Sequence, residues 1–404
     1  MYILVINAGS SSVKYKLFDM KDESVLAEGI VDRVGMAGAS LAHNAAEGKE
    51  IEIESDVPDY GTALELIADA LIHPEYGVIG SIDEISAVGH RVVHGGEKAS
   101  ASVLITPDVE SIIRECFDLA PLHNPPNMMG IEACRKILPG VPEVAVFDTA
   151  FHRTIPKEAY LYAVPYRLYG DYSIRRYGFH GTSHRYVAYR AAQVLGRPLE
   201  EIRMVTCHLG NGCSITAVKN GKSVDTSMGF TPLEGLIMGT RSGDIDPAIV
   251  FYLMDHTGMT APEVNTMLNK ESGLLGLSGL SRDMRDLEKA ASEGNKRAIT
   301  ALNCFAYRIR KYIGAYAASM GGLDSIVFTA GIGENSSKIR AMVCSGLEFL
   351  GARIDAQRNS GPGGERLISR DDSNVKILIV PTNEELMIAR DTMELTEVYR
   401  SIGP

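Results

Sequence analysis

The sequence predicts an α/β protein built from two related domains, and three segments carry this prediction. An apolar strand at residues 3–6, a small polar turn and a second strand at 13–19 open the chain. The same order of strand, glycine-containing turn and strand returns at residues 203–218. A third strand, residues 325–329, ends in glycines before a helical-looking segment at 336–350. Two copies about one domain length apart indicate an internal duplication, and strands interspersed with helices indicate an α/β fold.

The first turn, Asn7–Ser12, predicts a phosphate-binding cradle, because small residues bring backbone N–H groups and hydroxyls to one point. It is not a Walker loop or a dinucleotide fingerprint, since a strand follows where both motifs need a helix. A solvated turn is the alternative for this segment alone. The second copy, His208–Ser214, favours the cradle.

The third element, Gly331–Asn335, lies between a buried-type strand and a predicted helix. A Gly-x-Gly pair is weak evidence by itself. Its position after a strand favours a loop that contacts a nucleotide over a plain turn.

Composition predicts a reduced, cytoplasmic enzyme of at least two domains. The chain has 404 residues, a net charge of −11 and six cysteines without metal or disulfide spacing. The negative charge argues against nucleic-acid binding. The sequence contains no run of 18 apolar residues, so it predicts no membrane span. No basic segment of a signal peptide precedes the first strand. We therefore expect neither a nucleic acid nor a membrane as a partner.

Arginines among glycines and histidines are the candidates for binding anionic substrates: Arg91, Arg241 and the Arg175–Arg176 pair. The pairs His90/His94 and His180/His184 have the spacing of helical zinc ligands. Neighbouring glycines and the absence of His-Glu-x-x-His argue against zinc.

Two acids follow probable strands. Asp148 comes after the apolar run 143–147, and Glu384 follows the run 376–380. Sheet enzymes place their chemistry at the carboxyl ends of strands. Magnesium that bridges nucleotide phosphates takes one or two carboxylates, so this pair is sufficient for it.

Ten motifs span nearly the whole chain: Asn7–Lys14, Gly89–Gly96, Pro121–Pro125, Val146–His152, Arg176–His184, His208–Gly212, Met228–Gly235, Gly239–Asp244, Thr329–Asn335 and Pro381–Glu385. With these motifs the chain closely resembles the acetate kinases of the acetokinase family, within the actin, hexokinase and Hsp70 superfamily. The resemblance implies two duplicated actin-like (ribonuclease-H-like) domains with mixed sheets flanked by helices. The domains would comprise residues 1–150 with 385–404, and 151–384, with the active site in the interdomain cleft.

The resemblance also implies the site residues. Catalysis falls to Asp148, His180, Arg241 and Arg91. Arg91 would hold the substrate carboxylate, Arg241 and His180 the migrating phosphoryl group, and an apolar wall the acid: Val93, Leu122, Phe179 and Pro232. ATP or ADP would contact Ser10, Ser12, Lys14, His208, Leu209, Gly210, Asn211, Gly212, Asp283, Met284, Arg285, Gly331, Ile332, Gly333, Glu334 and Asn335. Asn7 and Glu384 would lie near Mg²⁺, which Mn²⁺ can replace. His123 and His208 are either ligand contacts or structural residues.

The implied reaction is reversible, magnesium-dependent transfer of the ATP γ-phosphoryl group to acetate, giving acetyl phosphate and ADP. A carboxylate is ionised at neutral pH and needs no base, so we expect Asp148 to orient metal and water rather than to move a proton. Direct in-line transfer is favoured over a relay through a phosphorylated Glu384. The alternatives are a propionate or other short-chain carboxylate kinase, a sugar or polyol kinase, and an actin-like ATPase switch.

The family is homodimeric, and the apolar helix predicted at Tyr307–Met320 is either core or a subunit contact. The preferred acid, the direction of the reaction and the phosphoryl donor stay open in the sequence.

Overall fold

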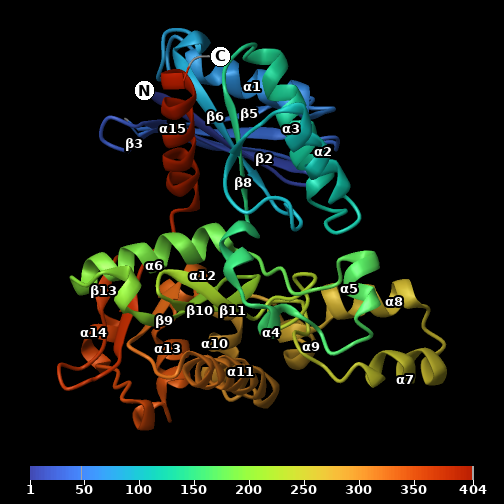
Figure 1. Ribbon diagram of the computed structural model, residues 1–404, viewed down its shortest axis with the longest axis vertical. Coiled ribbons are helices and arrows are strands. Elements are labelled where there is room, and N and C mark those ends of the chain that lie inside the picture. Colours follow the sequence, from blue (N-terminus) through green and yellow to red (C-terminus); the bar gives the residue numbers. More distant parts are fainter. Residues whose placement is uncertain (47, 403–404) are drawn as a thin grey trace. The chain divides into compact units, whose positions relative to one another are not determined.

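The computed structural model describes residues 1–46 and 48–402. These residues form two compact units, each with a sheet and helices packed against it (Figure 1). The first unit comprises Met1–Ala150 and the segment that begins at Asn383, and the second comprises Phe151–Thr382. Glu384, which the domain prediction assigned to the second domain, lies in the first unit. Within the described residues no helix has the length and apolar character needed to cross a membrane.

The sheet of the first unit has the strand order β5-β4-β3-β2-β1-β6-β8-β7. Its strands are β1 (Tyr2–Ala8), β2 (Ser12–Asp19), β3 (Ser24–Asp32), β4 (Ser40–Ala45), β5 (Lys49–Glu54), β6 (Ile85–Val92), β7 (Val103–Leu104) and β8 (Glu143–Phe147). β1 pairs with β6, and β6 with β8, in parallel, whereas the hairpin β1–β2 is antiparallel. Parallel strands end at one edge of the sheet, so β1, β6 and β8 bring the residues at their carboxyl ends together.

Helices cover both faces of this sheet. They are α1 (Tyr60–Ile72), α2 (Pro107–Glu115), α3 (Asn124–Ile137) and α15 (Glu384–Ile402), with a 3₁₀ turn η1 (Ile82–Glu84). The core under α1 and α3 contains Leu4, Ile6 and Val88. Side chains alternate between faces along a strand, so Gly89 and Arg91 lie on the other face, which α15 covers. A Cβ at Gly89 would lie 2.5 Å from Thr392 Oγ1 on α15, which explains the glycine.

The start of α15 is fixed by a side-chain cap. The backbone N–H of Leu386 donates to Asn383 Oδ1 at 3.1 Å, which satisfies one of the unpaired N–H groups of the first turn. The cap confirms the helix start that the sequence predicts at Thr382 or Asn383, and it places Glu384 at the first helical position.

The sheet of the second unit repeats this topology, with the order β11-β10-β9-β12-β14-β13. Its strands are β9 (Arg203–Leu209), β10 (Cys213–Lys219), β11 (Lys222–Thr226), β12 (Ser325–Thr329), β13 (Arg366–Leu367) and β14 (Lys376–Ile379). β9 forms an antiparallel hairpin with β10 and pairs in parallel with β12, which pairs in parallel with β14. β1, β2, β6 and β8 have the same relation, which confirms the predicted duplication and the α/β fold with two mixed sheets.

Two long helices, α6 (Gly181–Leu195) and α11 (Lys296–Met320), lie on opposite sides of this second sheet (Figure 1). The remaining elements are α4 (Lys157–Tyr160), α5 (Arg167–Tyr172), α7 (Ala248–Thr257), α8 (Ala261–Thr266), α9 (Gly273–Ser278), α10 (Met284–Ser292), α12 (Ala330–Asn335), α13 (Ser337–Cys344), α14 (Ala356–Ser360) and the short turns η2 (Ala150–Thr154), η3 (Leu199–Glu201), η4 (Met267–Glu271) and η5 (Glu348–Leu350). α11 begins well before the predicted Tyr307, because Asn295 caps it at Ala298 N–H. α13 ends at Cys344, earlier than the predicted helix to residue 350.

Candidate active site

The first cluster lies where β1, β6 and β8 end. The guanidinium of Arg91 donates to both carboxylate oxygens of Asp148, from Nε to Oδ1 at 3.1 Å and from Nη2 to Oδ2 at 2.6 Å. Its Nη1 donates to Asn7 Oδ1 at 3.3 Å. Asp148 is 1% exposed, whereas the Arg91 side chain is 23% exposed. A guanidinium has five N–H groups, so this arrangement leaves two of them for a ligand.

Acids outnumber bases around Arg91. Glu384 Oε2 lies 3.9 Å from Arg91 Nε, and Glu385 and Lys14 also act on Glu384. The pKa of Glu384 is raised to about 7, chiefly by burial and also by Asp148 and Glu385, while Arg91 and Lys14 act in the opposite direction. Three carboxylates against two cations leave excess negative charge. Carboxylate and amide oxygens are the donors that Mg²⁺ or Mn²⁺ prefers, so Glu384 and Asn7 fit the ion by the chemistry of their donor atoms.

The segment that follows β6 is held by two buried asparagines of α3. The backbone N–H of Val93 donates to Asn127 Oδ1 at 3.0 Å, and that of His94 donates to Asn124 Oδ1 at 3.0 Å. Asn127 Nδ2 donates in turn to Ala8 O at 2.7 Å, which joins the ends of β1 and β6. The backbone at Val93 and His94, directly after β6, is therefore held by α3, and the Pro121–Pro125 motif leads into this helix.

The second cluster is built on the β9–β10 hairpin. A Cβ at Gly212 would lie 3.5 Å from His180 Cε1 and 3.6 Å from Arg241 Nη1, so both side chains converge on the backbone of this turn. The His180 ring stacks on His208 with centroids 4.2 Å apart. His180 precedes α6 with a positive φ of 56°, a conformation rare for residues other than glycine that aims its ring at the hairpin.

A chain of hydrogen bonds holds the His180 ring against the hairpin. Nδ1 of His180 is hydrogen-bonded to Ser214 Oγ at 2.9 Å, and Ser214 Oγ is hydrogen-bonded to Nε2 of His184 at 2.7 Å. Nδ1 of His184 is in turn hydrogen-bonded to Thr206 Oγ1 at 2.7 Å. Burial lowers the pKa of His184 far below its usual value, so this residue stays neutral. The position of the His180 ring is therefore set by side chains of β9, β10 and α6.

Arg241 is half-buried and has no carboxylate partner among the described residues. None of their acids lies within 4 Å of it, and its Nη1 has only long contacts with Pro232 O (3.5 Å) and Met238 Sδ (3.8 Å). Desolvation lowers the pKa of the Arg241 guanidinium. An unbalanced cation beside Gly212 and His180 has the charge that attracts an anion.

The predicted loop Gly331–Asn335 forms the helix α12, because β12 turns directly into a helix at Ala330. The loop prediction was wrong in this respect. Glu334 Oε1 accepts from the backbone N–H groups of Ala330 (2.7 Å) and Thr382 (3.2 Å), which commits this oxygen to the fold. A Cβ at Gly333 would lie 3.5 Å from Cys207 O, so α12 packs directly on β9.

The chain matches the model of the acetokinase family over residues 2–390. It is 58% identical over 395 residues to an acetate kinase of Alkaliphilus metalliredigens, covering 98% of this chain and 100% of the relative. The chain belongs to the acetokinase family. A solved acetate kinase of Porphyromonas gingivalis superposes with a TM-score of 0.95 at 50% identity, covering 98% of this chain and 99% of that one. A solved propionate kinase of Francisella tularensis has a TM-score of 0.91 at 44% identity, with coverages of 98% and 99%.

The acetokinase motifs thus supply two clusters, one in each unit, and the predicted residues divide between them. The first unit holds Asn7, Ser10, Ser12, Lys14, Arg91, Val93, Leu122, Asp148 and Glu384, and the second holds Phe179, His180, His208, Leu209, Gly210, Asn211, Gly212, Pro232, Arg241, Asp283, Met284, Arg285 and the residues of α12. Lys14 and Ser10 are exposed and Ser12 is half-buried. Leu122 is 68% exposed, whereas Val93 and Phe179 are buried.

At the start of α10, the side chains of Asp283 and Arg285 can reach a ligand, whereas that of Met284 is buried. Asp283 caps α10 by accepting from Arg285 N–H at 2.9 Å, and its carboxylate pairs with the exposed Arg285 guanidinium at 2.6 Å. The Met284 side chain is buried, so only its backbone is accessible there.

Arg176 was a candidate anion binder, and the structure gives it another task. Its Nη1 donates to the carbonyl oxygens of Thr226, Ser227 and Met228, and its Nη2 donates to Glu234 at 2.6 Å. Arg176 therefore ties down the Met228–Gly235 motif. Phe179 is supported similarly, since His152 Nε2 donates to its carbonyl oxygen at 3.0 Å and Nδ1 accepts from Ser223 Oγ.

Sequence reasoning missed three features of this acetokinase. One is the pairing of Arg91 with Asp148. Another is the buried Arg340, which donates to the carbonyl oxygens of Gly333 and Glu334 at 2.9 Å and so fixes the end of α12. The third is a buried group of His90, Cys134 and Glu143 beneath α3. The members of each group are far apart in the sequence. Only the pairing of Arg91 with Asp148 could have been predicted, because both residues lie at the carboxyl ends of strands that the sequence indicates and that pair in parallel.

The raised pKa of Glu384 predicts a pH-dependent stability. Between its ordinary value of 4.5 and about 7 the folded chain binds more protons than the unfolded one. The free energy of unfolding therefore falls as pH rises through this window, by at most about 3 kcal/mol. Urea unfolding with a metal chelator at about pH 5 and about pH 8 measures this change. Glu384→Gln should remove this component, and an identical pH profile for the variant and the unmodified protein would contradict the assignment.

Proposed function

We propose that this acetokinase transfers the γ-phosphoryl group of ATP to acetate, reversibly, giving acetyl phosphate and ADP. The observation that carries the proposal is identity of 50% or more to acetate kinases over 98% of the chain. The two clusters support it, because each offers cationic groups suited to one of two anionic substrates.

Arg91 binds the acetate carboxylate in this proposal. Its two remaining N–H groups match a carboxylate, and Asp148 holds the guanidinium plane in one orientation. This gives Asp148 a positioning task and no proton to move, since acetate is already ionised at neutral pH. We also propose that Asp148 orients metal and water, because it follows the carboxyl end of β8 and lies beside Arg91.

Arg241 and His180 bind the migrating phosphoryl group. Both converge on Gly212, and no carboxylate among the described residues competes with a phosphate for the Arg241 guanidinium. Phosphoryl transfer passes through a loose transition state with charge on the equatorial oxygens, which such donors stabilise. The acetate oxygen attacks phosphorus as the bond to ADP breaks, so the negative charge moves from acetate to the leaving ADP oxygen.

Asn7, Glu384 and Asp148 are the residues that would hold Mg²⁺. When bound, the ion neutralises the nucleotide phosphates and polarises their oxygens. Glu384 serves this task in its ionised form, and the excess of carboxylates around it is then balanced. Relay through a phosphorylated Glu384 is the alternative. One displacement inverts the configuration of a chiral γ-phosphate and two displacements retain it, so the stereochemistry of acetyl phosphate distinguishes them.

ATP lies along the glycine turns in this proposal. The turn after β1 is closed by Gly9 N–H donating to Ser12 O at 2.7 Å, and that after β9 by Gly210 N–H donating to Gly212 O at 3.1 Å. Asn211 is exposed, whereas the Leu209 side chain is fully buried and offers only its backbone. The exposed ends of α10 and α12, with Asp283, Arg285, Gly331 and Asn335, contact the base and ribose.

Selectivity for a small acid comes from apolar side chains in this proposal, of which Val93 and Leu122 belong to the first unit and Phe179 and Pro232 to the second. We predict that Val93→Ala raises the ratio of kcat/KM for propionate to that for acetate about 10-fold, since one methylene group is worth about 1–3 kcal/mol in such a pocket. Steady-state kinetics with both acids measure it. Val103→Ala, a partly buried valine of β7, is the control, and an unchanged ratio in Val93→Ala would exclude Val93 from the wall.

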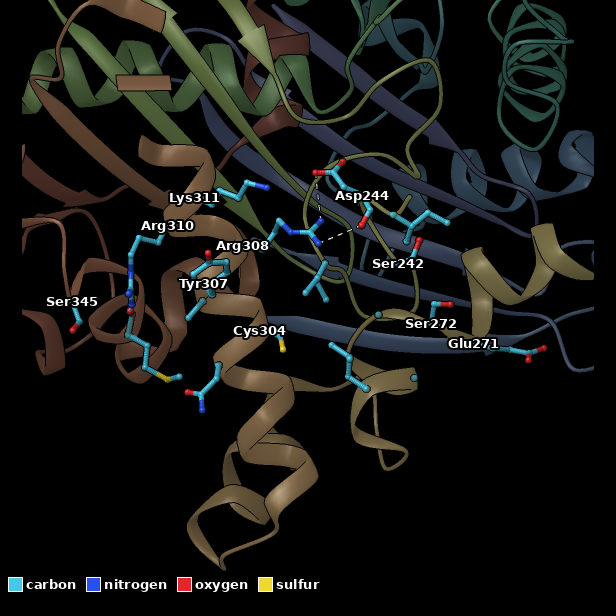
Figure 2. Close-up of a pocket in the computed structure, with 18 of the residues that line it drawn as sticks. Ser242, Asp244, Glu271, Ser272, Cys304, Tyr307, Arg308, Arg310, Lys311 and Ser345 are labelled. Carbon is cyan, nitrogen blue, oxygen red and sulfur yellow. Dashed lines mark hydrogen bonds and ion pairs between the residues drawn. The ribbon is translucent and has the colours of Figure 1, made fainter. Parts of the chain in front are cut away.

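The protein acts as a homodimer in the cytoplasm in this proposal. All six cysteines are free, as a reducing compartment requires. Exposed aromatic residues concentrate on the second unit, with Phe251 and Tyr252 of α7 67% and 61% exposed and Tyr307 of α11 65% exposed. Tyr307 lines a pocket of about 1310 Å³, and Figure 2 shows it there among the other lining residues. Exposed aromatic side chains of this kind fit a contact with a second copy of the chain.

We predict that the double variant Phe251→Glu, Tyr252→Glu lowers the sedimentation coefficient from that of a dimer to that of a monomer. Charged side chains placed at an apolar contact must be desolvated, which opposes association. Phe349→Glu is the matched control, because Phe349 is an 80% exposed aromatic residue of the same unit that lies in η5 rather than α7. A monomer for the unmodified protein, or a dimer for the double variant, would contradict this interface.

Hydroxamate formation tests the reaction. The purified protein is incubated with ATP, magnesium, hydroxylamine and one of acetate, propionate, butyrate or glycerol. Acyl phosphate from acetate above the other acids supports the proposal, and a preference for propionate supports the second candidate, for which the propionate kinase of Francisella tularensis is a relative. Phosphorylation of glycerol would indicate a polyol kinase, and ATP hydrolysis independent of any acid an ATPase switch.

A further inference from the structure

The loop that carries Arg241 is closed at its two ends by one pair of residues. Asp244 N–H donates to Gly235 O at 3.0 Å, and Gly235 N–H donates to Asp244 Oδ1 at 2.8 Å. The closure is tight, because a Cβ at Gly243 would lie 2.4 Å from Leu236 O. Gly235 and Gly243 both have positive φ, 105° and 67°. Residues 235–244 thus form a compact Ω-type loop whose shape depends on the Gly235–Asp244 closure.

Two side chains of α11 form hydrogen bonds to the residues that close the loop. Arg308 donates from Nη1 to Gly235 O at 2.9 Å and from Nη2 to Asp244 O at 3.3 Å. Tyr312 OH donates to Asp244 Oδ2 at 2.8 Å. Positions 308 and 312 are one helical turn apart, so they present one face of a rigid helix to the loop. Figure 2 shows Arg308 directed at Asp244, on the wall of the pocket beside α11.

The backbone of Arg241 itself is fixed within the loop. Met238 N–H donates to Arg241 O at 3.1 Å, and the flanking Thr240 and Ser242 bond to η4 and its end, through Ser272 N–H to Thr240 O (3.0 Å) and Ser242 N–H to Leu268 O (3.0 Å). The Arg241 guanidinium, by contrast, has no ion pair among the described residues that would orient it. The direction in which the Arg241 side chain points is therefore set by the backbone conformation of the loop.

We infer that Asp244, held by Arg308 and Tyr312, is a positioning residue that sets the direction of Arg241 toward the transferred phosphoryl group. The inference rests on the proposed role of Arg241 in phosphoryl transfer. Asp244 acts through the loop and touches no substrate. A displacement of about 1 Å at a transition-state donor costs up to about 100-fold in rate, so opening the closure should be costly for kcat.

A double-mutant cycle in the full-length protein tests this inference. Asp244→Ala should lower kcat by about 10- to 100-fold with less than about 3-fold change in the KM for acetate. In the Arg241→Ala background the same substitution should change kcat less than about 2-fold, because the group it positions is already gone. Asp244→Asn keeps an oxygen acceptor for Gly235 N–H and should recover part of the rate. Lys311→Gln, which lines the same pocket on α11, should leave kcat unchanged.

Equal losses in both backgrounds would overturn the inference, since they would reflect damage to the fold rather than action through Arg241. If Asp244→Ala does not fold, Tyr312→Phe serves in the same cycle, with an expected loss of about 3- to 10-fold that again vanishes without Arg241. A normal kcat for Arg241→Ala alone would refute the proposed role of Arg241. That result differs from a failure of the inference about Asp244. In that case Arg241→Ala lowers kcat, and Asp244→Ala lowers kcat further by the same factor as in the unmodified protein.

Discussion

Arg241→Ala is expected to lower kcat by about 10³-fold or more while the melting temperature stays the same or rises. Arginines that stabilise the charge of a phosphoryl group in flight are worth about 10³–10⁵ in kcat. Arg241 is half-buried with no carboxylate within 4 Å among the described residues, and desolvation lowers its pKa, so its charge is a cost to the folded state. Removing it relieves that cost. Arg241→Ala should therefore lose activity without losing thermal stability.

Steady-state kinetics and thermal unfolding of the same preparations measure the two effects. Arg241→Lys keeps a charge but not the planar fork, and should recover only a small part of the rate. Arg353→Ala is the control, because Arg353 is an exposed arginine of the same unit that pairs with Asp372 and has no part in the proposed site. A kcat within about 10-fold of the unmodified protein for Arg241→Ala would contradict the role assigned to this residue.

Arg91→Ala is expected to have the opposite stability signature and a comparable loss of activity. The substitution removes the main cation beside Asp148, Glu384 and Glu385 and leaves the fully buried Asp148 without its partner. Breaking a buried pair in this way costs about 3–5 kcal/mol. The carboxylate of acetate also loses its guanidinium, so we expect kcat/KM for acetate to fall by about 10²- to 10³-fold, largely through KM.

Urea unfolding and acetate saturation curves test this prediction. The double variant Arg91→Ala, Asp148→Asn should regain part of the stability, because the unpaired charge is gone, but none of the acetate binding. Arg114→Ala is the control, since Arg114 forms exposed ion pairs with Glu110 and Glu132 on the same unit. An unaltered KM for acetate in Arg91→Ala would place the carboxylate elsewhere.

The parts of the fold that follow from local pattern were predictable from the sequence. Strand, turn and strand at residues 3–19 and 203–218 predict the two hairpins β1–β2 and β9–β10, since apolar strands around small polar turns determine their own pairing. The partners β6, β8, β12 and β14 pair across long separations. Their common topology in the two units became visible only in the structure.

The candidate site residues were found through motifs, but their partners were not. Asp148 and Glu384 follow strands, which is a local signal, whereas the pairing of Asp148 with Arg91 joins the ends of β6 and β8. The prediction of a loop at Gly331–Asn335 was wrong because two glycines lower helix propensity, and the buried Arg340 that fixes the end of α12 lies outside that segment. The closure of Gly235 on Asp244 involves α11, more than 60 residues away in the sequence.

Attack of an acetate oxygen on the γ-phosphorus is the central claim, and ³¹P NMR of the product formed from ATP and acetate labelled with ¹⁸O in both carboxylate oxygens tests it most directly. The account predicts that acetyl phosphate accumulates with one ¹⁸O bound to every product phosphorus, visible as an upfield isotope shift. Unlabelled inorganic phosphate formed at a rate independent of acetate would contradict it.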